Sequence, residues 1–252
     1  MKKDRLRKLA GDKRFISGIY NYCDRWCERC PQASRCLNFT LSEEDSADPG
    51  TRDIKNEAFW KKLSEVFSDT LELLKEAAKE HGIDLEHLDT EQYQEEDKRR
   101  KEMAESHEIC RAAKTYSHLV DDWFTSAGSL FSASPTPDGE VRGLEEALEV
   151  IRWYQHFIYV KLMRAVRGGL EERGEEFDEF PKDSEGSAKI ALIAIDRSIG
   201  AWGTVYGHDL LHDEKILRFV AYLDRLREEV EESFPKARSF IRPGFDKIDL
   251  NG

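Results

Sequence analysis

Apolar side chains recur at three- and four-residue spacings along most of this chain, and that periodicity decides its fold class. It predicts five amphipathic helices, over residues 56–82, 90–125, 144–167, 187–206 and 210–234. Gly82 and Pro235 provide stop signals after the first and the last of them. No run of alternating apolar and polar residues bounded by hairpin turns occurs, so the sequence predicts an all-α protein.

Two of these segments are apolar on several faces. The segment 144–167 becomes apolar almost all round after Trp153, and the segment 187–206 contains small residues that allow neighbouring helices to approach closely. Helices of this kind are packed on several sides. We therefore expect an antiparallel helical bundle of four or five helices with these two most deeply buried, and with Ile158 and Ile195 in its core.

The first part of the chain differs in composition from the rest. Residues 1–14 hold seven basic and two acidic side chains, a charge of +5, whereas the whole chain carries −12 at pH 7. The polar run 42–52, with Pro49 and Gly50, is typical of a linker. The sequence thus predicts a basic, cysteine-rich segment with its linker at 1–52 and a helical bundle domain with a short tail at 53–252. The basic start either docks locally and aids solubility or binds an acidic partner.

Four of the five cysteines fall within fourteen residues, in the pattern C-x3-C-x2-C-x5-C formed by Cys23, Cys27, Cys30 and Cys36. Thiolates are soft ligands, and four of them can surround a tetrahedral zinc ion or an iron–sulfur cluster. Arginines interleave with the cysteines, and their positive charge is expected to lower the thiol pKa values. The pattern therefore predicts a metal centre in an N-terminal metal-binding appendage.

The ligand spacing favours an iron–sulfur cluster over structural zinc. Structural zinc usually draws on two well-separated cysteine pairs, whereas this set is continuous and Cys30 precedes Pro31, a dipeptide found in iron–sulfur loops. Two alternatives stay open: the four cysteines are small buried hydrophobes, or they form two disulfides. Cys110, on the apolar face of the second predicted helix, is most simply a core residue.

Two enzyme motifs overlap the cysteine pattern. Cys23, Cys27 and Cys30 match the C-x3-C-x2-C of radical S-adenosylmethionine enzymes, and Trp26 to Cys30 matches the W-C-x-x-C of thioredoxins. Both motifs belong with units of alternating strands and helices, which this sequence does not predict. Neither activity is therefore expected.

Polar residues on the predicted helices provide a second candidate site. Asp196 interrupts an apolar run, so we expect it to be buried and paired with a basic side chain. Its expected partners are Lys161, His156, Arg197 and Arg152. His208 and His212, four residues apart at the start of the last predicted helix, could bind a metal ion on one helical face.

Charge and hydropathy exclude several classes of partner. No stretch approaches the roughly 20 apolar residues of a membrane-spanning helix, and the basic start lacks the apolar run of a signal peptide. We therefore expect a cytoplasmic protein, in which clustered cysteines serve as metal ligands more readily than as disulfides. The net charge of −12 disfavours a nucleic-acid partner, because phosphate groups would repel most of the surface.

Three functions remain open from the sequence. The first is a metal-binding helical protein whose four-cysteine centre acts in redox chemistry or in docking a protein partner. The second is a helical-bundle enzyme with a site near His156 and Asp196 and a purely structural metal centre. The third is a non-enzymatic acidic adaptor. No Gly-rich phosphate loop, Ser-His-Asp order or zinc-protease motif occurs, so no catalytic residue is assigned.

Overall fold

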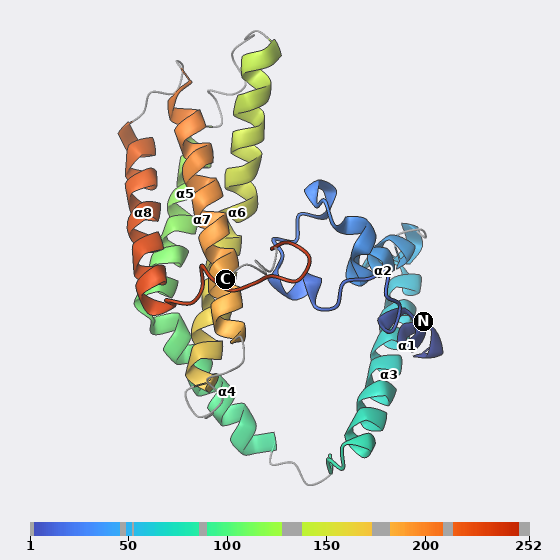
Figure 1. The fold of residues 1–252 in the computed structure, drawn as a ribbon. Helices are drawn as coiled ribbons and strands as arrows, with labels where there is room; N and C mark the ends of the chain where they lie inside the picture. The colour runs from blue at the N-terminus through green and yellow to red at the C-terminus, as the bar shows by residue number, and fades with distance from the viewer. Residues whose placement is uncertain are drawn as a thin grey trace, which may run out of the picture. The chain divides into compact units, whose positions relative to one another are not determined.

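The computed structural model describes residues 3–45, 49–51, 53–85, 90–127, 138–172, 182–208 and 214–246 (Figure 1). Within these ranges the backbone forms α-helices, 3₁₀ helices and the turns between them, and no strand is present there. The prediction of an all-α protein is confirmed. None of the helices in the described ranges has the length and apolar character needed to cross a membrane.

The long helices follow the predicted periodicity. The first predicted helix is α3, and the second is divided at His107 into α4 and α5. The observed bounds are α3 Glu57–Glu80, α4 Thr90–Ser106, α5 Glu108–Ala127, α6 Asp138–Glu172, α7 Asp183–Tyr206 and α8 Glu214–Ser233. Gly82 follows the end of α3 with a left-handed φ of 67°, while the Ile83 amide donates to the Ala78 carbonyl at 2.8 Å. The predicted stop signal therefore works as a glycine cap.

The short elements at the start of the chain were not predicted from the sequence. In the described ranges 3–45 and 49–51 they are two α-helices and four single-turn 3₁₀ helices (Figure 1). Their bounds are α1 Lys3–Ala10, η1 Ile19–Tyr22, η2 Cys27–Arg29, η3 Ala33–Arg35, α2 Leu37–Asp45 and η4 Pro49–Thr51. Single turns of this kind have no hydrophobic period, so pattern reading does not detect them.

The chain divides into two compact units. The first, here called the cysteine unit, contains residues 1–94 and 241–252, and the second, the helical unit, contains residues 95–240. The chain passes from one unit to the other within α4 and between Phe240 and Ile241, so the cysteine unit is built from two distant parts of the sequence. The predicted division into residues 1–52 and 53–252 stays a prediction.

The helical unit buries its core among four helices. Contacts join α5 with α6, α6 with α7, α7 with α8, and α8 with α5. Ile158 and Ile195 are fully buried, as predicted. At the centre the Trp202 ring stacks on Phe219 with centroids 4.6 Å apart, and the Trp202 indole N–H donates to the Tyr116 hydroxyl at 2.9 Å. Because both partners of this bond are fully buried, it satisfies two polar groups that water cannot reach.

The cysteine unit engages the basic start of the chain. Arg7 on α1 pairs with Glu76 on α3 at 2.5 Å, and Arg5 pairs with Glu44 on α2 at 2.5 Å. The predicted helix of this unit, α3, contacts α1 and η4. It exposes four large apolar residues by more than half of their surface: Trp60, Phe67, Leu71 and Leu74.

Candidate metal centre

The four clustered cysteines stand at the ends of 3₁₀ turns. Cys23 follows η1, Cys27 opens η2, Cys30 closes η2 and Cys36 closes η3. The Cys30 amide donates to the Cys27 carbonyl at 3.1 Å, which brings two of the four residues onto one turn. Each short turn reverses the chain, so the cysteines can face a common space although the segment has no longer element.

The first turn, between Cys23 and Cys27, contains a residue in a strained backbone conformation. Arg25, between Cys23 and Cys27, has a φ of 61°, and it alone among the described non-glycine residues has a positive φ. A left-handed conformation costs roughly 1–2 kcal/mol in a residue that carries a Cβ. The neighbouring Asp24 carboxylate accepts a hydrogen bond from the Trp26 amide at 3.2 Å and so holds this turn. Strain that persists in this way is typical of functional loops.

All four cysteines line one cavity of about 20 Å³. Its other walls are mostly apolar, and two of them are themselves buried: Ile19 is 1% exposed and Trp26 is 6% exposed. The remaining lining residues are Tyr20, Asp24, Arg25, Ala33, Phe39 and Phe245. One water molecule needs roughly 10–15 Å³, and the cavity is larger than this. An open space therefore separates the walls that carry the cysteines.

The thiols in this cavity influence one another electrostatically. Burial raises the pKa of the Cys27 thiol, and the neighbouring Cys23 and Cys36 raise that pKa further. Burial also raises the pKa of Cys30, where a backbone hydrogen bond at Gln32 acts in the opposite direction. Without a cation these two thiols are therefore held in the protonated form, and a metal ion would have to displace the protons.

The predicted effect of the arginines on these pKa values is wrong for Cys27 and Cys30. The pKa of both thiols is raised, and burial is the largest influence on each of them. The Arg29 guanidinium instead lies over the Trp26 ring, 4.1 Å from its centroid. This is a cation–π contact with a residue of the cavity wall.

The thiols surround the cavity without closing on a single point. All four are free, as is Cys110, so they form no disulfide in this structure. Across the described part of the chain, no three His, Cys, Asp or Glu side chains already stand as ligands of one metal ion. A tetrahedral zinc ion requires four sulfurs about 2.3 Å from its centre. The thiols would have to move inward to bind one ion in that way.

Phe245 lines the cavity, although it was not predicted from the sequence as part of the site. It belongs to residues 241–246, which were predicted to form part of a short tail of the other domain. The neighbouring Gly244 has a φ of 77° and lies directly against Ile16 and Ile19. The dipeptide Pro243-Gly244 does indicate a turn, but nothing in the sequence indicates what that turn contacts.

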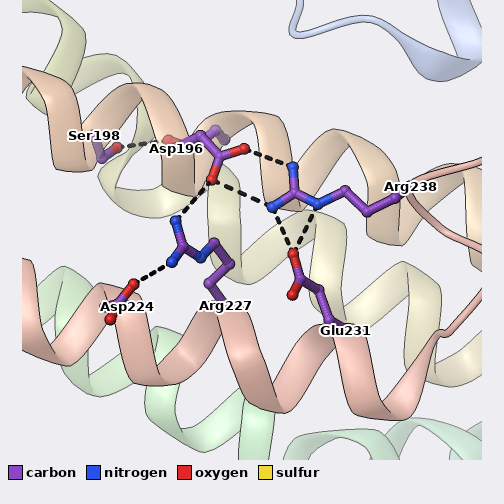
Figure 2. A network of polar contacts seen from close by, with 7 residues as sticks. Asp196, Ser198, Asp224, Arg227, Glu231 and Arg238 are labelled. Carbon is purple, nitrogen blue, oxygen red and sulfur yellow. Dashed lines mark hydrogen bonds and ion pairs between the residues drawn. The ribbon is translucent and has the colours of Figure 1, made fainter.

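Asp196 is paired as predicted, but it is not buried and its partners are different. Its side chain is 37% exposed, and Figure 2 shows it between two arginines. Arg238 donates to both carboxylate oxygens at 2.6 and 3.3 Å, and Arg227 on α8 lies 3.7 Å away. Arg238 also pairs with Glu231, and Arg227 with Asp224. The network joins α7, α8 and the segment after α8.

The four predicted partners of Asp196 are engaged elsewhere. Arg197 donates to the Tyr154 hydroxyl at 2.5 Å, and the Arg152 guanidinium lies 4.1 Å from the Phe124 ring centroid. Lys161 lies over the Phe157 ring at 5.3 Å. His156 is mostly exposed and lies 3.7 Å from Asp121 on α5. Asp196 therefore faces α8 while His156 faces α5, and no described contact brings the two together.

The second predicted metal pair is only partly described. His208 does not lie on the last helix: it follows the C-terminal end of α7, where its amide donates to the Val205 carbonyl at 3.3 Å. His212 lies outside the described residues, so the pair stays a prediction. Cys110 is fully buried in the core of the helical unit, as expected, and burial raises its pKa to about 12.

No known protein family, curated protein or solved structure matches this chain.

Proposed function

We propose that the cysteine unit binds an iron–sulfur cluster through Cys23, Cys27, Cys30 and Cys36, and that the cluster gives the protein a redox function. The observation that carries the proposal is the shared cavity: four thiols from successive turns line one small, largely apolar space. A single free, half-buried thiol does not require three other thiols around the same cavity. Four of them around one space are the donor set of a thiolate-bound metal centre.

The sequence pattern of these cysteines favours a cluster over a single ion. Zinc draws four sulfurs to one centre, whereas a four-iron cluster places each sulfur on a different iron and spreads them apart. The structure places the four cysteines around one cavity. The preference for a cluster comes from the sequence, namely the continuous cysteine pattern and the dipeptide Cys30-Pro31.

The apolar walls suit a redox centre. A hydrophobic shell controls how far solvent reaches a metal site, and solvent exposure is one determinant of its reduction potential. Trp26 and Ile19 provide such a shell in the interior of the unit. Free thiols and an oxygen-sensitive cofactor both require a reducing compartment, so the proposal places the protein in the cytoplasm. Electron transfer also requires a protein partner.

We further propose that the helical unit is an antiparallel four-helix bundle composed of α5, α6, α7 and α8. The closed series of contacts among these helices supports this arrangement, as does the side-by-side course of the four in Figure 1. Successive helices joined by short connections run antiparallel in such bundles. The remaining helix that was predicted for the bundle, α3, belongs to the cysteine unit.

Purification without oxygen tests the metal proposal directly. The expected product is brown, contains iron and sulfide, and shows a broad visible absorption that dithionite bleaches. Each Cys→Ser variant at positions 23, 27, 30 and 36 should lose most of its iron, because every ligand is needed to retain the cluster. The matched control is Cys110→Ala, which removes the remaining thiol from the other unit and should keep full iron content.

Two outcomes would overturn the proposed cofactor. A colourless protein with one zinc per chain, lost in the same four variants, would replace the cluster with a single tetrahedral ion. A protein that holds neither metal after iron and sulfide reconstitution would show that these cysteines bind no metal.

A further inference from the structure

Residues 241–246 approach the cysteine cavity from the far end of the sequence. Phe245 forms part of the cavity wall, beside all four cysteines. Gly244 packs so closely that a Cβ built on it would lie 2.7 Å from the Ile16 Cδ1 atom and 3.1 Å from the Ile19 Cδ1 atom. Its φ of 77° is also one that residues with side chains rarely adopt. Glycine is therefore required here for both conformation and space.

The segment is held in a fixed turn of its own. The Arg242 amide and guanidinium both donate to the Asp246 carboxylate, at 2.9 and 2.8 Å. The Phe245 and Asp246 amides donate to the Arg242 carbonyl, each at 3.2 Å. The Arg242 guanidinium lies 5.0 Å from the Phe245 ring centroid. These contacts hold the turn that carries the phenyl ring, and Gly244 packs this turn against Ile16 and Ile19.

We infer that residues 241–246 are the cover of the cysteine site and control the access of solvent, oxidants and chelators to its thiols. The inference about the thiols rests on geometry alone, and the inference about a bound metal rests in addition on the proposed function. The cover acts through Phe245, which closes one side of the cavity, and through Gly244, which allows the segment to approach. Residues around a metal centre that contact no metal commonly change its affinity by roughly 10- to 100-fold.

Two substitutions remove the cover by different routes. Gly244→Ala introduces the clash with Ile16 and displaces the segment, whereas Phe245→Ala removes the wall without straining the backbone. Gly82→Ala is the control for the first, because Gly82 has a φ of 67° with open space around it. Phe67→Ala is the control for the second, because Phe67 is 61% exposed in the same unit. Phe245→Leu, which refills part of the wall, should restore most of the protection.

All variants are prepared with Cys110→Ala, so that every reactive thiol belongs to the cluster. The first readout is the rate at which Ellman's reagent reacts with the metal-free protein. The second is the rate at which EDTA and air bleach the cluster-loaded protein. Both rates should rise about tenfold in Gly244→Ala and in Phe245→Ala and stay near wild type in the two controls. Circular dichroism confirms that each variant is folded.

The two readouts separate this inference from the proposed function. If Gly244→Ala and Phe245→Ala react faster with Ellman's reagent while the wild-type protein holds no metal, the inference about the cover is supported and the metal proposal is refuted. If the wild-type protein is loaded but neither variant changes either rate, the cover is refuted and the metal proposal stands. Faster reaction in Gly82→Ala to the same extent as in Gly244→Ala would attribute the effect to backbone strain and would also refute the cover.

Discussion

The network around Asp196 allows a quantitative test of how much a half-exposed ion pair contributes to stability. Asp196 accepts two hydrogen bonds from Arg238, and the side chains are 37% and 44% exposed. A fully buried pair would lose about 3 kcal/mol or more when one partner is removed, and an exposed pair contributes roughly 0.2–1 kcal/mol. The bidentate geometry raises the value above that of a simple surface pair. We therefore expect Asp196→Ala to lower the free energy of unfolding by about 1–2 kcal/mol.

A double-mutant cycle isolates the pair itself. Asp196→Ala, Arg238→Ala and the double variant are unfolded in urea and followed by circular dichroism. Arg238 also contacts Glu231, so its single variant should lose at least as much as Asp196→Ala. The coupling energy should be about 1 kcal/mol, and it should decrease in high salt because both groups are partly solvated. Additivity within about 0.3 kcal/mol would refute the reasoning, and a coupling near 3 kcal/mol would show that the pair is shielded from water.

Two further predictions concern buried polar groups of the helical unit. Burial raises the pKa of Cys110 to about 12. The stability gained by keeping this thiol protonated in the folded protein is therefore complete below the usual thiol pKa near 8.5 and is lost as pH rises toward 12. From pH 8 to 10.5, the wild-type protein should lose about 2 kcal/mol relative to Cys110→Ala in urea unfolding; a constant difference between the two proteins would contradict this. Tyr116→Phe should cost about 1–3 kcal/mol, because it leaves the buried Trp202 indole N–H without its acceptor; a loss below about 0.5 kcal/mol would show that water or another group replaces the hydroxyl.

Elements with a strong hydrophobic period were predictable from the sequence. The helices α6 and α7 carry apolar residues that reveal their presence and the burial of Ile158 and Ile195. Their extent was underestimated: α6 spans Asp138–Glu172 and α7 Asp183–Tyr206, against predictions of 144–167 and 187–206. The break at His107 was not predictable in this way, because the charged stretch before it has no apolar stripe to interrupt. The shared position of the four cysteines was expected from their spacing, although the 3₁₀ turns that produce it have no period.

Contacts between distant parts of the chain were not predictable. The burial predicted for Asp196 was wrong, because apolar neighbours along a helix say little about what lies against one particular face. That face meets Arg238, which belongs to the segment after Pro235. Phe245 was missed for the same reason: its partners precede it by most of the chain. A single sequence reports local pattern and composition, while such contacts depend on how the elements pack.

The position of Phe245 has a consequence for how the protein is made. A chain emerges from the ribosome beginning at its N-terminus, and domains generally fold as units in that order. The four cysteines are therefore synthesised early, but the wall that Phe245 provides is synthesised only after the whole helical unit. The cysteine unit cannot be completed during translation of the helices. Until residues 241–246 have been synthesised, a nascent chain therefore lacks the Phe245 wall beside its four cysteines.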